Sequence, residues 1–169
     1  GLGRNNTAAI KTDGTLWTWG KGTEGQLGDG VSGDHDEDEP IQIGSDTDWG
    51  DGEYSIENNS RIAGGDDHIM IIKKDGTLWA FGYNEHGQLC TGNTTNLSSP
   101  VQIGTDTWLQ VAGSAGCTHA INTDGELWVA GRGYFGQLGT GSTTSISTLA
   151  QIGSASNWVD LATARHATG

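Results

Sequence analysis

The sequence has few basic residues: 8 Lys and Arg stand against 21 Asp and Glu, which gives a formal net charge of −13 at pH 7. Proteins that bind nucleic acids draw affinity from clustered Lys and Arg, so this composition argues against a nucleic-acid partner. It also argues against attraction to an anionic membrane surface. No apolar run approaches the ~20 residues of a membrane-spanning helix. We therefore expect neither nucleic-acid binding nor membrane insertion.

Cysteine and proline are also scarce, with two of each among 169 residues. Two cysteines cannot form a disulfide framework, and the spacing of Cys90 and Cys117 suits no zinc site. We expect two small core residues, and a bridge between them stays open as the alternative. The low proline content separates the 29 glycines from those of collagen or of a disordered tract. So many glycines beside seven tryptophans indicate packed β structure with tight turns.

Three short motifs recur three times each, always in the same order. They are Asp-Gly-x-Leu-Trp, Gly-Gln-Leu and Gln-Ile-Gly, and each Gln-Ile-Gly is followed by a further tryptophan. In the three copies the motifs begin at Asp13, Gly25 and Gln42, at Asp75, Gly87 and Gln102, and at Asp124, Gly136 and Gln151. Such self-similarity is the signature of a repeat architecture.

Each repeat predicts short antiparallel strands around an Asp-Gly hairpin turn, in which glycine supplies the positive φ. The paired segments are 8–11 with 16–19, 69–72 with 78–81, and 120–122 with 127–130. Pro40 and Pro100 begin predicted outer strands, because proline is tolerated at a strand's first residue or at a sheet edge. A last short strand closes each repeat, over 60–63, 109–112 and 159–162. No segment has the 3.6-residue period of a substantial helix, so the chain is predicted to be all-β.

A four-stranded unit of about 50 residues cannot bury both of its faces alone, so neighbouring units must stack. This repeat length favours radial stacking into a β-propeller over an open β-solenoid. We expect one partial β-propeller domain over residues 1–169. Its repeat units lie at about 7–68, 69–117 and 118–166, and the first unit carries an insertion at about 50–60.

The combined pattern Thr-Asp-Gly-Thr-Leu-Trp-x-Trp-Gly, Gly-Gln-Leu-Gly and Pro-x-Gln-Ile-Gly resembles the regulator-of-chromosome-condensation repeat. The resemblance covers nearly the whole chain outside the insertions. It implies blades of four antiparallel strands, about three of them, in a ring of seven. The missing blades belong either to a longer chain, which we favour, or to further copies of this one.

The family's Gly-x-x-His-Thr stretch is only partly kept. Histidine stands at 68 and 166, while Asn6 and Cys117 occupy the matching positions. The resemblance implies that such a histidine ties a turn to a neighbouring strand. A structural role of this kind carries no catalysis.

No constellation of residues predicts a catalytic, metal or cofactor site, so we expect a protein that is not an enzyme and needs no cofactor. The sequence contains no nucleophile elbow and no phosphate-binding loop with its lysine. Cys117 and His119 share one face of a predicted strand. A Cys–His nucleophilic pair there is the alternative to ordinary packing, which we favour.

Two sets of variable residues are candidate partner-binding positions. The first is an acidic loop, whose oxygens could hold calcium or dock a basic partner, although a solvated loop is the simpler interpretation. Its members are Asp34, Asp36, Glu37, Asp38 and Glu39. The second set follows the second hairpin strand in two repeats and has the composition of a protein-binding hot spot. Its members are Tyr83, His86, Arg132, Tyr134 and Phe135.

We therefore expect a non-catalytic protein-interaction scaffold, whose partners are other proteins, further copies, or remaining blades. The acidic composition and the loops rich in Thr, Asn, Ser and Gly favour a bacterial or viral-like member of the family. An extracellular or virion-surface location, as a structural component of a virion or appendage, fits that composition. The resemblance implies two alternatives, an inhibitor of a specific enzyme and a regulator like a guanine-nucleotide exchange factor.

Overall fold

The computed structural model describes residues 3–50 and 61–163, which form ten strands and no helix. The strands are β1 Asn6–Ile10, β2 Leu16–Lys21, β3 Asp36–Ile43, β4 Ile62–Gly64, β5 His68–Ile72, β6 Thr77–Gly82, β7 Leu97–Ser114, β8 Cys117–Asn122, β9 Leu127–Gly131 and β10 Ile146–Gln151. The all-β prediction is confirmed. Within these ranges no helix of membrane-spanning length and hydropathy occurs.

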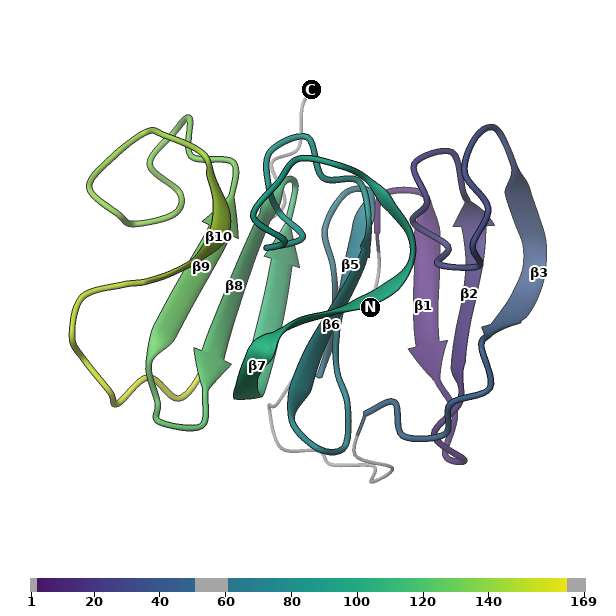
Figure 1. Ribbon diagram of the computed structural model, residues 1–169, viewed down its shortest axis with the longest axis horizontal. Coiled ribbons are helices and arrows are strands. Elements are labelled where there is room, and N and C mark those ends of the chain that lie inside the picture. The colour runs from purple at the N-terminus through teal and green to yellow at the C-terminus, as the bar shows by residue number, and fades with distance from the viewer. Residues whose placement is uncertain (1–2, 51–60, 164–169) are drawn as a thin grey trace.

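The strands stand in a row of three blades, and every pairing is antiparallel (Figure 1). The first blade is the sheet β1–β2–β3. The long strand β7 serves two blades, because its part up to Thr107 pairs with β6 and its part from Trp108 pairs with β8. The second blade is thus β4, β5, β6 and the start of β7, and the third is the end of β7 with β8, β9 and β10.

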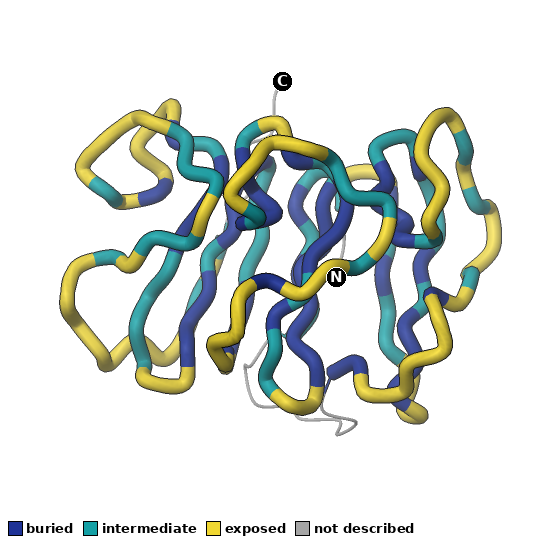
Figure 2. The backbone as a smooth tube through the Cα atoms, in the orientation of Figure 1, coloured by how far each residue is buried: buried dark blue, intermediate teal, exposed yellow. Residues whose placement is uncertain are grey.

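The second blade is buried on both faces, because it lies between the other two. All five residues of β5 are buried, which explains an apolar run without polar alternation (Figure 2). Ile69 and Ile71 pack in the core shared with the first blade, while Met70 and Ile72 pack in the core shared with the third. Successive side chains of one strand therefore fill two different cores.

In the core that each two adjacent blades share, a pair of tryptophans packs edge to face. The ring centroids of Trp49 and Trp79 are 5.6 Å apart at 78°, and those of Trp108 and Trp128 are 6.3 Å apart at 84°. Such geometry places the positive ring edge against the negative face. Trp158 occupies the same repeat position as Trp49 and Trp108, but it is 40% exposed and has no such ring partner in the described chain.

A buried lysine reinforces the contact between the first two blades. The ammonium group of Lys73 lies 4.4 Å from the Trp49 ring centroid and 4.6 Å from that of Trp79. It donates to the carboxylates of Asp46 and Asp48. Burial lowers the pKa of Lys73, but the hydrogen bonds to the two carboxylates outweigh it, and the net shift is upward. The lysine therefore stays charged between the rings.

The hairpin turns show what the repeat motif does locally. Asp13 accepts hydrogen bonds from both the backbone N–H and the hydroxyl of Thr15, and that hydroxyl in turn accepts from the indole N–H of Trp17. The second repeat copies these contacts. In the third repeat Glu126 replaces the threonine, and the buried indole nitrogen of Trp128 has no hydrogen-bond partner among the described residues. The motif thus carries a turn and a tryptophan anchor together.

Three predicted features differ from the structure. The outer strands begin at Asp36 and Leu97, ahead of Pro40 and Pro100, and each pairs on one side only within its blade, which is where proline is tolerated. The acidic segment therefore belongs largely to a strand and not to a loop. No strand forms over 159–162, because the two earlier copies pair with a following hairpin strand and the described residues contain none here.

Cys90 and Cys117 are both free and buried, as expected for small core residues. Cys90 adopts a φ of 63°, at a position where the other repeats have glycine. Most of the predicted insertion, 51–60, and the predicted His166 lie outside the described residues.

The tryptophan pairs predict a sharp difference in stability between two equivalent positions. Trp108→Ala should lower the free energy of unfolding by about 3–5 kcal/mol, because it empties a packed interface between blades. Trp158→Ala is the matched control and should cost less than about 1 kcal/mol, because this residue is 40% exposed and packs against no second tryptophan ring among the described residues. Urea unfolding followed by tryptophan fluorescence measures both. Equal losses would contradict the role given to the paired rings.

Candidate functional site

Three long loops lie along one edge of the blades, at the top in Figure 1. They follow β2, β6 and β9 and span 22–35, 83–96 and 132–145. In each loop the glutamine of the Gly-Gln-Leu motif accepts a hydrogen bond from the backbone N–H two residues earlier. The donors and distances are Glu24 at 2.6 Å, His86 at 3.0 Å and Phe135 at 2.8 Å. The repeated glutamine thus fixes the backbone that carries the variable side chains.

The second loop is held by one buried asparagine. The side-chain amide of Asn84 donates to Thr91, Asn93 and Thr95, and its carbonyl accepts from the N–H of Leu89. Because all polar atoms of this buried side chain are used, the loop has a defined shape. Tyr83 and His86 are therefore presented on a rigid support.

The structure brings all five predicted hot-spot residues together across the junction of the second and third blades. We call Tyr83, His86, Arg132, Tyr134 and Phe135 the aromatic seam. The ring centroids of Tyr83 and His86 are 6.3 Å apart, and those of His86 and Tyr134 are 5.6 Å apart. The Arg132 guanidinium carbon lies 5.1 Å from the Tyr134 ring centroid and 5.5 Å from that of Phe135. The seam is one continuous row, in which the ring contacts are edge to face and Arg132 lies beside the last two rings.

The seam is partly covered at one end and open at the other. Tyr83 and His86 are half-buried, whereas Tyr134 is 53% exposed and Phe135 76% exposed. Burial and a hydrogen bond from its hydroxyl to Glu85 raise the pKa of Tyr83 to about 12. Burial and the nearby Arg132 charge lower the pKa of His86, so its ring is neutral at pH 7. The open end thus combines two exposed rings with one cation.

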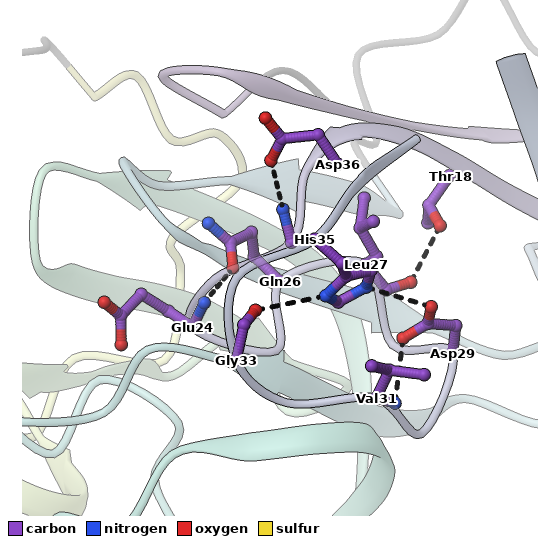
Figure 3. Close-up of polar contacts among 10 residues, drawn as sticks. Thr18, Glu24, Gln26, Leu27, Asp29, Val31, Gly33, His35 and Asp36 are labelled. Atoms are coloured by element: carbon purple, nitrogen blue, oxygen red, sulfur yellow. Dashed lines mark hydrogen bonds and ion pairs between the residues drawn. The ribbon is translucent and has the colours of Figure 1, made fainter. Parts of the chain in front are cut away.

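The acidic segment lies apart from the seam, on the outer strand β3 of the first blade (Figure 1). Its residues point into solvent or are half-buried. In the adjoining loop His35 lies between the carbonyl of Gly33 at 3.2 Å and the carboxylate of Asp29 at 3.1 Å (Figure 3). The Gly33 hydrogen bond and the Asp29 charge raise the pKa of His35.

In the part of the chain that the structure describes, the His, Cys, Asp and Glu side chains form neither a cluster of metal ligands nor an activated cysteine nucleophile. No group of three His, Cys, Asp or Glu side chains in these ranges could hold a metal ion. The Cys117 thiol donates to the carbonyl of Arg132, and the His119 ring meets the carbonyl of Gln137 at 3.3 Å. Burial raises the pKa of Cys117, which disfavours the thiolate that a nucleophile requires.

A cleft of about 430 Å³ lies between the first and second blades, away from the seam residues. Its lining includes Asp29, Asp46 and the Trp49–Trp79 pair. Both carboxylates are already engaged, one with His35 and the other with Lys73. The cleft therefore presents no free charge comparable to that of Arg132 among the described residues.

Comparisons with known proteins give the same family as the motifs. A model described as the Regulator of chromosome condensation (RCC1) repeat matches residues 13–72 and 75–121, and a second model of that description matches 60–88. The chain belongs to the RCC1-repeat family. The prediction of the family is confirmed.

Curated relatives of this RCC1-repeat chain include a receptor and a group of homologous proteins. The Ultraviolet-B receptor UVR8 of Arabidopsis thaliana is 32% identical over 103 residues, which are 60% of this chain and 21% of that protein. Protein RCC2 of Homo sapiens is 35% identical over 100 residues, 56% of this chain and 16% of that protein. The chain thus matches about a fifth or less of the length of these relatives.

Solved structures show the same fold. Prp20p from Saccharomyces cerevisiae superimposes with a TM-score of 0.74 at 19% identity, over 90% of this chain and 37% of that one. Human WBSCR16 gives a TM-score of 0.75 at 20% identity, over 89% and 38%. The all-β blades of this chain are therefore blades of an RCC1-type β-propeller.

Sequence reasoning found the seam residues but missed two features of the structure. Alignment of the repeats places Tyr83 and Arg132 at the same position, which indicates that their loops lie at the same edge of the blades. It does not show that the side chains of neighbouring loops touch. It also missed the partner of His68, which is fully buried and reaches the Thr118 hydroxyl of the third blade at 3.3 Å. This contact gives the histidine the structural role that the resemblance implied.

His68 predicts a loss of stability in mild acid. Burial lowers the pKa of His68 to about 4 from an unfolded value of 6.5, so between these values the unfolded state binds the extra proton. Stability therefore falls as the pH drops through this window, by up to about 3 kcal/mol. His68→Asn, which copies Asn6 of the first blade, should remove this part of the dependence. Urea unfolding of both proteins at about pH 7 and about pH 4.5 measures it, and parallel losses would contradict it.

Proposed function

We propose that this chain is a non-catalytic protein-binding module and that the aromatic seam is its contact surface. The observation that carries the proposal is the pair of exposed rings, Tyr134 and Phe135, that lie beside the Arg132 guanidinium. Tyrosine and arginine are enriched among residues that dominate binding energy, and preorganised side chains lose little entropy on association.

The known proteins support binding to other proteins as the general activity. Prp20p, one of the structural neighbours, has binding properties to Gsp1p and histones. For this chain, an exchange-factor-like regulator and an inhibitor of a specific enzyme are narrower versions of the same proposal. The net charge of −13 weighs against a role on chromatin, because such a surface repels nucleic-acid phosphates.

We propose, further, an extracellular or virion-surface setting, with the chain as part of a virion or appendage. The support is compositional: a strong excess of acidic residues and loops rich in Thr, Asn, Ser and Gly. Fractionation of the source cells or particles, followed by immunodetection, tests this setting. Signal confined to the cell interior would overturn it and leave the binding proposal intact.

The binding proposal predicts that peptides selected against this chain depend on the open end of the seam. The probe is a display library of random peptides, selected on the immobilised wild-type chain. Phe135→Ala should weaken the selected peptides about tenfold or more, because it removes an exposed aromatic anchor. Titration by fluorescence anisotropy measures the change.

The matched control is Val31→Ala, which removes another exposed apolar side chain in a different loop. It should leave the affinity within about twofold. Selected peptides that bind Phe135→Ala and wild type equally would show that the seam is not the contact surface.

A further inference from the structure

Arg132 carries a charge that the described structure leaves unpaired. Its guanidinium contacts two aromatic rings, but no carboxylate of the described residues lies within ion-pairing distance, and its buried Nε has no hydrogen-bond partner among them. Lys73, by contrast, meets two carboxylates. What distinguishes Arg132 is that the two rings beside it are exposed, so that its cation and the rings face a ligand together.

Two carboxylates near Tyr83, at the covered end of the seam, accept hydrogen bonds from uncharged donors. Glu85 accepts from the hydroxyl of Tyr83, and Glu24 accepts from the side-chain amide of Asn96 at 2.8 Å. Neither carboxylate pairs with Arg132.

The backbone that carries Arg132 is held in place before any ligand arrives. The backbone N–H of Arg132 donates to the Gly116 carbonyl at 2.8 Å, and its carbonyl accepts from the Cys117 thiol at 3.1 Å. A Cβ added at Gly116 would lie 3.4 Å from the Cβ of Arg132 and 3.3 Å from the His86 ring, so the turn beneath is closely packed. The planar guanidinium on this backbone lies beside the Tyr134 and Phe135 rings, and its fork of donors suits a carboxylate, which it binds through two parallel hydrogen bonds.

We propose that the aromatic seam binds an acidic segment of a protein partner. One Asp or Glu carboxylate of that segment pairs with Arg132, and a neighbouring apolar side chain packs on Phe135. The inference rests on the proposed function and adds the chemistry of the ligand. The negative charge of the whole chain does not prevent this contact, because fields between exposed charges are screened beyond about 8 Å at physiological salt.

The test starts from peptides selected from a random display library on the wild-type chain. We expect the selected sequences to share an Asp or Glu next to an aromatic or aliphatic residue. Arg132→Gln should weaken their binding about tenfold or more, and Arg132→Lys should weaken it less, because lysine keeps the charge but not the fork. Peptides with Gln or Asn in place of the acidic residue should lose a similar factor on wild type and nothing further on Arg132→Gln.

Lys21→Gln is the matched control, because Lys21 holds the repeat position of Arg132 in the first blade. It removes the same charge from the chain and should leave binding unchanged. Circular dichroism and urea unfolding establish that each variant folds.

Selected peptides that are basic, or that bind Arg132→Gln as well as wild type, would overturn the acidic ligand. If those peptides still lose binding on Phe135→Ala, the proposed function stands without it. Peptides indifferent to both substitutions would overturn the proposed function as well.

Discussion

Each blade of this chain is stable only because its neighbours cover its faces. The second blade shows the constraint most clearly, since consecutive residues of β5 fill two separate cores and none reaches solvent. The tryptophan pairs lie at these junctions, and Lys73 is buried between one pair with its charge matched by two carboxylates. This side-by-side packing also brings the loops of neighbouring blades together, and with them the residues of the seam. It is reflected in β7, one strand that belongs to two blades.

The repeat divides the work between a constant frame and variable positions. The Gly-Gln-Leu glutamine recurs with the same hydrogen bond to the backbone in all three repeats, and the Asp-Gly turn orients the tryptophan indole through a threonine in the first two. Positions between them are free to change. The residues of the aromatic seam lie at these variable positions, in loops whose backbone is held by the recurring residues. A binding surface can therefore change without a change of the fold.

Much of the fold could be predicted because the repeat supplies three readings of one pattern. The hairpins around Asp13, Asp75 and Asp124 and the outer strands were predicted within a few residues. The prediction of a strand over 159–162 was wrong, because strand formation depends on a pairing partner and not on local sequence alone. The acidic segment was predicted to be a loop, because a run of charged residues is typical of solvated loops. In the structure it lies largely in an edge strand, whose side chains point into solvent and can therefore be charged.

The sequence by itself determined the family, the all-β blades and the residues that vary between repeats, because these depend on short motifs at fixed spacing. The tertiary structure alone decided that Tyr83 and His86 meet Tyr134 and Arg132, since residues about 50 positions apart touch only when two blades pack. It also decided which charges are paired within the described chain. The sequence shows Lys73 and Arg132 only as two cations, and the structure shows that Lys73 meets two carboxylates whereas Arg132 meets none of those described.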